Sequence, residues 1–259
     1  MIKVLDIFNF IDSFAPFDTA MDFDNVGVLV GSMDAEVKKC LVALDVTEEV
    51  INEAKNNGVN LIISHHPVIF NAIKRLDLDM IPSKLIKNEI SVLCAHTNLD
   101  VASIGVNTCL AERLSLQNLQ PLSSYLSKFG VLPMGLVGEL ENACECNEFA
   151  EIVKTSLNCQ GIRYTDINKR IKKVAICSGA GGDLIDDAIR QKVDAFVTGE
   201  IKHHEILTAV KNKVCVYDAG HFKTEDIVVL PLVKKLSKEF TEVEFIKSQK
   251  CTDRIKYMV

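Results

Sequence analysis

The stretch VNLIISHHP, residues 59–67, decides the class of fold. Its apolar run has the length and β-branched content of a buried strand, and two adjacent histidines and a proline follow the run directly. Open α/β sheets place their chemistry at the carboxyl ends of their strands. We therefore expect an α/β fold in which His65 and His66 lie at a functional edge of a sheet.

A second copy of this pattern lies in the other half of the chain. In each copy, a strand that begins with two lysines passes through a helix into a second apolar strand. The segments are KKCLVA (38–43), VINEA (50–54) and VNLIIS (59–64) in the first copy, and KKVAIC (172–177), LIDDA (184–188) and VDAFVT (193–198) in the second. The copies align without a gap, which predicts an internal duplication: two similar α/β halves with ligand-type residues at their strand ends.

The duplication gives an expected division of the chain. We place the first half at residues 1–126, joined by the C-terminal segment 235–259, and the second half at 127–234. The region 115–167 contains glycines and a proline around short apolar pairs, which predicts turns between short strands.

The two ends of the chain carry further patterns. The apolar spacing of Leu5, Phe8, Ile11 and Phe14 predicts an amphipathic first helix. Residues 226–236 have helical spacing, with Pro231 expected in the first turn or at a kink. Residues 242–246 alternate as a half-exposed strand.

Composition excludes several classes of protein. The 259 residues are 48% hydrophobic and 25% charged, which is ordinary for a globular protein. Neither a signal peptide nor an apolar run of ~18 residues is present, so we expect a cytoplasmic protein without membrane contact. The net charge of −6 argues against a nucleic-acid partner. The nine cysteines include no C-x-x-C pair, which argues against a thiolate metal site.

The histidines favour a metal site. All six follow apolar, strand-like runs: His65, His66, His96, His203, His204 and His221. Imidazole and carboxylate ligands suit zinc, iron, manganese, cobalt or nickel. The alternative is that each histidine is a separately satisfied polar residue.

Spacing selects five metal ligands. His65 and His66 would point to opposite faces of an extended strand, which favours two ions over one. His221 and Glu225 share a face if their segment is helical, and Asp100 completes the set. Two ions ~3.5–4 Å apart would hold a water and clamp the oxygens of a hydrolytic transition state.

Other polar residues are second candidates. Glu200, His96 and His204 are assigned to catalysis, either as general acid or base or as partners that orient a ligand imidazole. For His203 a surface or capping role is equally plausible. The SGAGGD stretch at 178–183 either cradles a phosphate or forms a plain tight turn.

The chain resembles a known family over essentially its whole length. The matching motifs are DNVGVLVG (24–31), SHHP (64–67), HTNLD (96–100), TGE (198–200) with His204, and GHFKTE (220–225). They resemble the GTP cyclohydrolase I type 2 homologues, the NGG-interacting-factor-three-like dinuclear metal proteins. Phe23 stands where the family often has tryptophan, which we interpret as a packing change. Leu136 stands where relatives often carry arginine.

The resemblance implies a fold and an assembly. It implies two intertwined α/β halves with mixed sheets, a dinuclear metal site between them, and a toroidal homohexamer built from dimers. The chain looks like the short form of the family, without its inserted domain. Carried over by position, the family's metal ligands fall on His65, His66, Asp100, His221 and Glu225.

The function that follows is a divalent-metal-dependent hydrolase with two ions per chain: zinc, iron, manganese or nickel. The family name suggests GTP as the substrate, with water attack at the purine C8, ring opening and formate release. The alternatives are a metal-dependent phosphoesterase and a non-catalytic metal-binding protein that regulates or binds a partner. Family-level analogy does not establish a reaction.

Overall fold

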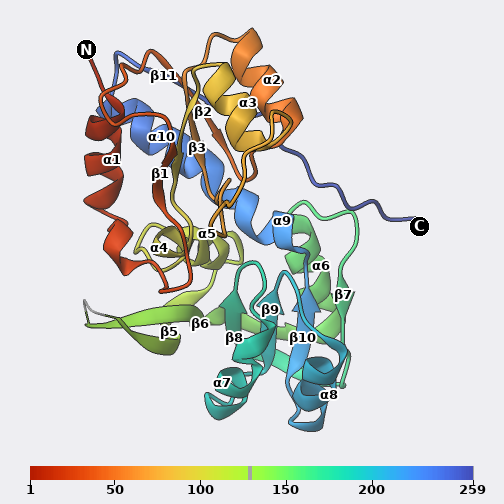
Figure 1. Ribbon diagram of the computed structural model, residues 1–259. Helices are drawn as coiled ribbons and strands as arrows, with labels where there is room; N and C mark the ends of the chain where they lie inside the picture. The colour runs from red at the N-terminus through yellow and green to blue at the C-terminus, as the bar shows by residue number, and fades with distance from the viewer. Residues whose placement is uncertain (128–129, 259) are drawn as a thin grey trace. The chain divides into compact units, whose positions relative to one another are not determined.

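A computed structural model describes residues 1–127 and 130–258, which form two compact units (Figure 1). The first unit contains residues 1–104 and 228–252, and the second contains 105–227 and 253–259. The first boundary thus differs from the expected one at residue 126. The reason is that α5 (Val106–Arg113) supplies Leu110 and Ala111 to the core of the second unit.

The first unit is built around a five-stranded mixed sheet in the order β1-β4-β3-β2-β11. Its strands are β1 (Gly27–Val30), β2 (Lys39–Ala43), β3 (Leu61–Ser64), β4 (Ser91–Cys94) and β11 (Glu244–Lys247). Its helices are α1 (Val4–Asp12), η1 (Phe17–Thr19), α2 (Glu48–Asn56), α3 (Ile81–Lys87), α4 (Thr97–Asp100) and α10 (Val229–Glu239). Strands β2, β3, β4 and β11 run parallel, and β1 is antiparallel to β4.

The second unit is built around a six-stranded mixed sheet in the order β5-β6-β8-β9-β10-β7. Its strands are β5 (Gln117–Ser127), β6 (Gly130–Glu145), β7 (Arg163–Tyr164), β8 (Arg170–Cys177), β9 (Ala195–Thr198) and β10 (Cys215–Asp218). Besides α5, its helices are α6 (Cys146–Ser156), η2 (Gly182–Leu184), α7 (Ile185–Arg190), α8 (His203–Lys211) and α9 (His221–Glu225). A short turn, η3 (Asp226–Val228), leads back to the first unit. Apolar residues pack in two clusters within this unit.

Strand register supports the internal duplication. In the first unit Cys40 pairs with Leu61, and in the second Val174 pairs with Ala195, in each case between parallel strands. These are the residues that the alignment of the two copies matches. The repeated unit is therefore a parallel strand–helix–strand–helix–strand, β2 to β4 and β8 to β10. The sequence pattern predicts the strands and the first helix of each copy, but not the second helix, α3 or α8.

Near the ends of the chain, the predictions for Pro231 and for the alternating strand are confirmed, whereas the first helix differs in detail from its prediction. Pro231 lies in the first turn of α10, where its missing N–H has no intrahelical partner to lose, and β11 covers most of the alternating segment. The first helix forms, but it buries Val4, Ile7 and Ile11 and leaves Leu5 40% exposed. The expected apolar face was wrong in its first positions, because Val4 and Ile7 form a second apolar row with Ile11 and this row faces the core.

The segment expected to hold turns between short strands instead forms the long antiparallel pair β5–β6. Gly135 lies inside β6 with φ of +62°, and a Cβ there would lie 2.7 Å from the carbonyl oxygen of Ile176 on β8. Glycine at this position permits a close approach of two backbones and does not end a strand. That is why the prediction of turns was wrong.

None of the helices within residues 1–127 and 130–258 is long and apolar enough to span a bilayer.

Candidate functional site

Three imidazoles gather at the carboxyl ends of β3 and β4 in the first unit. We call His65, His66 and His96 the histidine cluster. Its ring centroids lie 5.1–5.5 Å apart, and one nitrogen from each ring lies within 4.8 Å of the others. Because β3 ends at Ser64, the alternation of faces along a strand does not extend to His65 and His66. The expectation that they diverge was therefore wrong: both rings join one group of donors.

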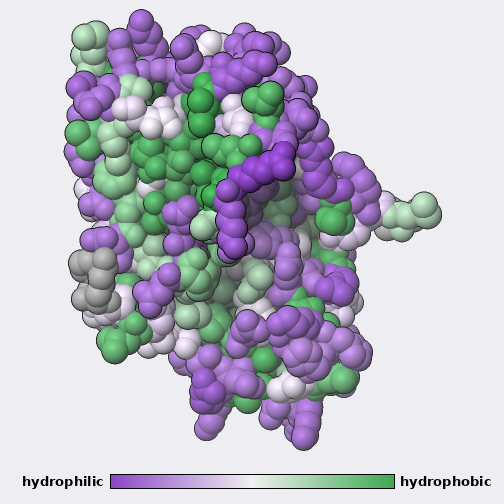
Figure 2. Space-filling view, viewed as in Figure 1, coloured by the Kyte–Doolittle hydropathy of each residue, from purple (hydrophilic) through white to green (hydrophobic). Residues whose placement is uncertain are grey.

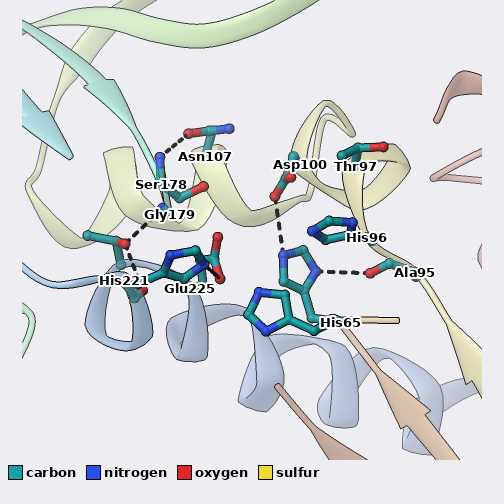
Figure 3. Close-up of polar contacts among 12 residues, drawn as sticks. His65, Ala95, His96, Thr97, Asp100, Asn107, Ser178, Gly179, His221 and Glu225 are labelled. Atoms are coloured by element: carbon teal, nitrogen blue, oxygen red, sulfur yellow. Dashed lines mark hydrogen bonds and ion pairs between the residues drawn. The ribbon is translucent and has the colours of Figure 1, made fainter. Parts of the chain in front are cut away.

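Each ring of the histidine cluster is held through its Nδ1 atom. Nδ1 of His65 lies 2.9 Å from the carbonyl oxygen of Ala95, as Figure 3 shows. Nδ1 of His66 lies 2.7 Å from Asp45 Oδ1, and that of His96 lies 2.9 Å from Asp24 Oδ1. A carbonyl or carboxylate oxygen can only accept, so each Nδ1 carries a hydrogen. The lone pair of each neutral ring is then on Nε2, the tautomer that metal-binding histidines use.

Asp100 faces the histidine cluster from the end of α4. Its Oδ1 lies 3.5 Å from Nε2 of His65, as the dashed line in Figure 3 marks. His65 is 3% exposed, so this pair is shielded from water. A lone pair on Nε2 that faces a carboxylate oxygen is favourable only with a proton or a cation close to both atoms.

Asp24 is a buried anchor for the turn that carries His96. Its carboxylate accepts hydrogen bonds from His96 and from the backbone N–H and hydroxyl of Thr97. Burial by itself raises the pKa of Asp24, but these hydrogen bonds outweigh it and lower the pKa to about 2. Asp24 is therefore an ionised hydrogen-bond acceptor at neutral pH.

The second unit contributes a histidine–glutamate pair on α9. Nε2 of His221 lies 3.0 Å from Oε2 of Glu225, one helical turn away, as the i, i+4 spacing predicts. Nδ1 of His221 lies 2.8 Å from Oε1 of Glu200. The ring is thus oriented as in the histidine cluster, with Nε2 presented to a buried carboxylate, since Glu225 is only 4% exposed.

The glycine-rich loop at 178–183 packs against this pair. Gly179 has φ of +59°, and a Cβ there would lie 2.1 Å from Glu225 Oε1 and 3.2 Å from His221 Nε2. Its N–H donates a hydrogen bond to the hydroxyl of Thr224, and a dashed line at Gly179 in Figure 3 marks this bond. The Ser178 N–H donates to buried Asn107 Oδ1 at 3.0 Å. The loop is therefore a tight turn that makes room for the Glu225 carboxylate, and the hydrogen bonds of its first two amides are made within the unit.

The second candidates separate into two groups. Glu200 orients His221, and His96 lies among the donors of the histidine cluster. By contrast, the structure places His203 and His204 on exposed positions at the start of α8, with His204 Nε2 3.9 Å from Glu205 Oε1. Solvent exposure of 76% makes the catalytic assignment of His204 the weakest of the set.

Two functional carboxylates were missed in the interpretation of the sequence. Asp24 was noted only as part of a motif, and Asp45 was not considered. Asp45 lies two residues beyond the end of β2, at the same edge of the sheet as the histidine cluster. The strand-end rule that identified His65 also applies to it, but only the structure shows that its carboxylate reaches His66.

Comparison with known proteins gives one consistent result. A family model described as Duf34/NIF3 (NGG1p interacting factor 3) matches residues 2–254. A Clostridium perfringens protein named GTP cyclohydrolase 1 type 2 homolog is 35% identical over 265 residues, which cover 99% of this chain and 100% of that protein.

Solved structures agree with this result. The Bacillus cereus protein related to NIF3 superposes with a TM-score of 0.92 at 25% identity, covering 99% of each chain. A hypothetical protein of Staphylococcus aureus superposes with a TM-score of 0.91 at 32% identity, again covering 99% of each chain. The fold of the whole chain is therefore shared with these proteins.

Proposed function

Because this chain belongs to the Duf34/NIF3 family, we propose that it is a divalent-metal-dependent hydrolase with a dinuclear centre. The observation that carries the proposal is the orientation of the imidazoles. His65 and His221 each present Nε2 to a carboxylate oxygen, while an acceptor holds Nδ1. Two such histidine–carboxylate pairs in one chain supply the nitrogen and oxygen donors that bind divalent metal ions in proteins.

The proposed ligands are the five residues that the sequence predicted. They are His65, His66, Asp100, His221 and Glu225. Nitrogen and oxygen donors without thiolates suit zinc, iron, manganese or nickel. When bound, divalent ions supply Lewis acidity, which makes water a better nucleophile and stabilises negative charge that develops on the substrate.

The remaining polar residues orient groups and move protons in this proposal. Asp45 and Glu200 hold the rings of His66 and His221. His96, with Nδ1 hydrogen-bonded to Asp24, presents Nε2 for proton transfer to or from the substrate. Oε1 of Glu200 lies 2.8 Å from Nδ1 of His221, so we assign Glu200 to orientation instead of proton transfer.

GTP is the proposed substrate because relatives are named GTP cyclohydrolase 1 type 2 homolog. Hydrolysis at the purine C8 would release formate. The protein is further proposed to form a homohexamer, for which light scattering should give six times the 28.7 kDa mass of the chain.

The metal centre is tested by elemental analysis of protein grown with added metals. The proposal expects two ions per chain, with a loss in Glu225→Gln. Glu205→Gln is the matched control, because Glu205 is equally buried in the second unit but bonds the Lys202 N–H. Fewer than one ion per chain, unchanged in His65→Ala, would refute the metal centre.

The reaction is tested by formate release from GTP with zinc, manganese, iron or nickel supplied in turn. Metal-dependent release that disappears in Glu225→Gln supports the cyclohydrolase. A protein that holds two ions but releases no formate excludes GTP, and phosphoesters are then the next substrates. Absence of turnover on either class favours the partner-binding role that the family description, an interacting factor, suggests.

A further inference from the structure

Two phenylalanines of the first unit lie exposed side by side. Phe23 is 63% exposed and Phe70 is 48% exposed, and their ring centroids are 6.2 Å apart at an interplanar angle of 49°. Figure 2 shows apolar side chains gathered over the strands of this unit. Because Phe23 is 63% exposed, it packs against Phe70 at the surface and not in the core. Exposed aromatic rings in contact are typical of a binding surface.

Hydrogen bonds of the two residues after Phe23 connect the phenylalanine pair to the histidine cluster. Asp24, next to Phe23, bonds His96 at 2.9 Å. Asn25 follows, and its side-chain Nδ2 donates to the carbonyl oxygen of Ile69 at 2.6 Å, which fixes the backbone beside Phe70. Three consecutive residues thus place one ring, orient a histidine and anchor the segment that carries the other ring.

The same segment carries exposed positive charge. Lys74 and Arg75 follow Phe70 within five residues, and the Arg75 side chain is 87% exposed. Arg75 lies 3.7 Å from Asp77, a surface pair that is weak and easily exchanged for another anion. Exposed aromatic rings and cations carried by one segment suit a flat ring that bears phosphate.

We infer that Phe23 and Phe70 bind the flat heteroaromatic ring of a phosphorylated ligand beside the histidine cluster. The ring stacks on the face of one phenyl ring and contacts the other, which is tilted by 49°. The phosphates are attracted by Lys74 and Arg75. This inference rests on the proposed function, because it names the substrate class for the same site. The exposed cations favour a phosphorylated ligand over the apolar surface of a second copy of the chain.

The chain contains no tryptophan, which makes a direct test available. Phe23→Trp would place the only tryptophan of the variant in the proposed platform, and its emission can be excited selectively at wavelengths that tyrosine does not absorb. Guanosine and GTP should both quench its emission, because each can stack on the indole. Inorganic triphosphate, which has no ring, should not quench it. The control is Phe240→Trp, at a position packed on Phe10 and Phe245 of the same unit; its emission should not respond to any of the three.

Affinity measurements on the wild-type background complete the test. Phe23→Leu and Phe70→Leu should each weaken GTP binding about tenfold in calorimetry, since base stacking on an aromatic side chain contributes on that order. Both variants should keep the metal content and the mass of the wild-type assembly. Lys74→Ala with Arg75→Ala should weaken GTP binding and leave guanosine binding unchanged.

The outcomes separate this inference from the proposed function. Unchanged GTP affinity in both leucine variants, or emission that ring-bearing ligands do not quench, overturns the platform. A change of assembly mass in the leucine variants also overturns it and assigns the pair to subunit contact. A loss of the metal centre would instead appear in the elemental analysis, and ring binding can be measured with or without metal.

Discussion

At the scale of single residues, the orientation of each imidazole in the candidate site depends on the acceptor that its Nδ1 atom contacts. The imidazoles of the histidine cluster and of His221 are all held through Nδ1. Three of them contact a carboxylate, and one contacts a backbone carbonyl. That uniformity comes from residues outside the predicted ligand set. The five proposed ligands were selected by residue type and spacing, whereas the orientation of their side chains depends on partners distant in sequence.

The first prediction concerns Gly179. A methyl group at this position would clash with Glu225 Oε1 at 2.1 Å, whereas one at Gly58 would meet nothing within 4 Å, although φ is similar at +66°. Gly58→Ala should cost about 1 kcal/mol of unfolding free energy from backbone strain alone. Gly179→Ala should cost more and should also reduce metal content. Chemical denaturation and elemental analysis of both variants measure the difference, and equal effects would contradict the clash.

The second prediction concerns Asp45. Asp45→Ala removes the acceptor at 2.7 Å from His66 Nδ1 and should lower metal affinity about 10- to 100-fold, measured by competition with a chelator. The matched control is Asp34→Ala, which removes an exposed carboxylate paired with Lys3 in the same unit. If the two variants bind metal equally well, Asp45 does not position the ring.

At the scale of elements, the two copies of the repeat share strand register but not the chemistry at their strand ends. After β3 the first copy has two histidines, and after β9 the second has Gly199 and Glu200. A Cβ at Gly199 would lie 2.7 Å from His221 Cα, so glycine lets α9 approach β9. The second copy therefore presents its proposed ligands from a helix, and the first copy presents two of its three proposed ligands from the loop after a strand.

This difference explains what the sequence could predict. Strands β2 to β4 and β8 to β10 follow from apolar runs and the repeat, because buried parallel strands are nearly continuous in hydrophobicity. The long pair β5–β6 could not be predicted, because β5 is largely exposed and Gly135 resembles a turn residue until its contact with Ile176 is known. The contacts of Asp24 with His96 and of Phe23 with Phe70 link positions more than 40 residues apart, which no local pattern encodes.

The third prediction concerns the start of β8. Burial raises the pKa of Asp194, but hydrogen bonds from Lys169 and from the backbone of Lys173 and Lys172 outweigh it and lower the pKa below its ordinary 3.8. Asp194 therefore stabilises the fold fully above pH 3.8 and ceases to do so as pH falls through the lowered value.

Asp194→Asn should consequently reduce the unfolding free energy at pH 7 by about 1 kcal/mol and have little effect near pH 2. Denaturation curves at pH 7, 5 and 2 compare the two proteins. A deficit in the variant that stays constant at every pH would show that the charge is not what Asp194 contributes.

At the scale of the whole molecule, the chain passes between the two units three times. The second unit takes all six of its strands from the continuous segment 105–227, whereas the first needs α10 and β11 from 228–252. β11 pairs with β2 along four residues, and Glu53 on α2 accepts hydrogen bonds from Ser248 and Gln249. The first unit is thus closed by a segment that is distant in sequence.

The fourth prediction follows from this difference. A fragment of residues 105–227 should fold with a cooperative thermal transition, because it contains its whole sheet and both apolar clusters. A fragment of residues 1–104 should not, since the edge of β2 that β11 covers is left open. Circular dichroism during heating distinguishes the two, and a cooperative transition in 1–104 would contradict the prediction.

The late return of α10 and β11 has a consequence for biosynthesis. A ribosome releases the chain from its N-terminus, so domains ordinarily fold in the order in which they emerge. Here residues 105–227 are complete in the nascent chain while residues 1–104 still wait for their last strand. The sheet of the second unit can therefore form first, and the histidine cluster of the first unit acquires its final surroundings only after residues 228–252 have emerged.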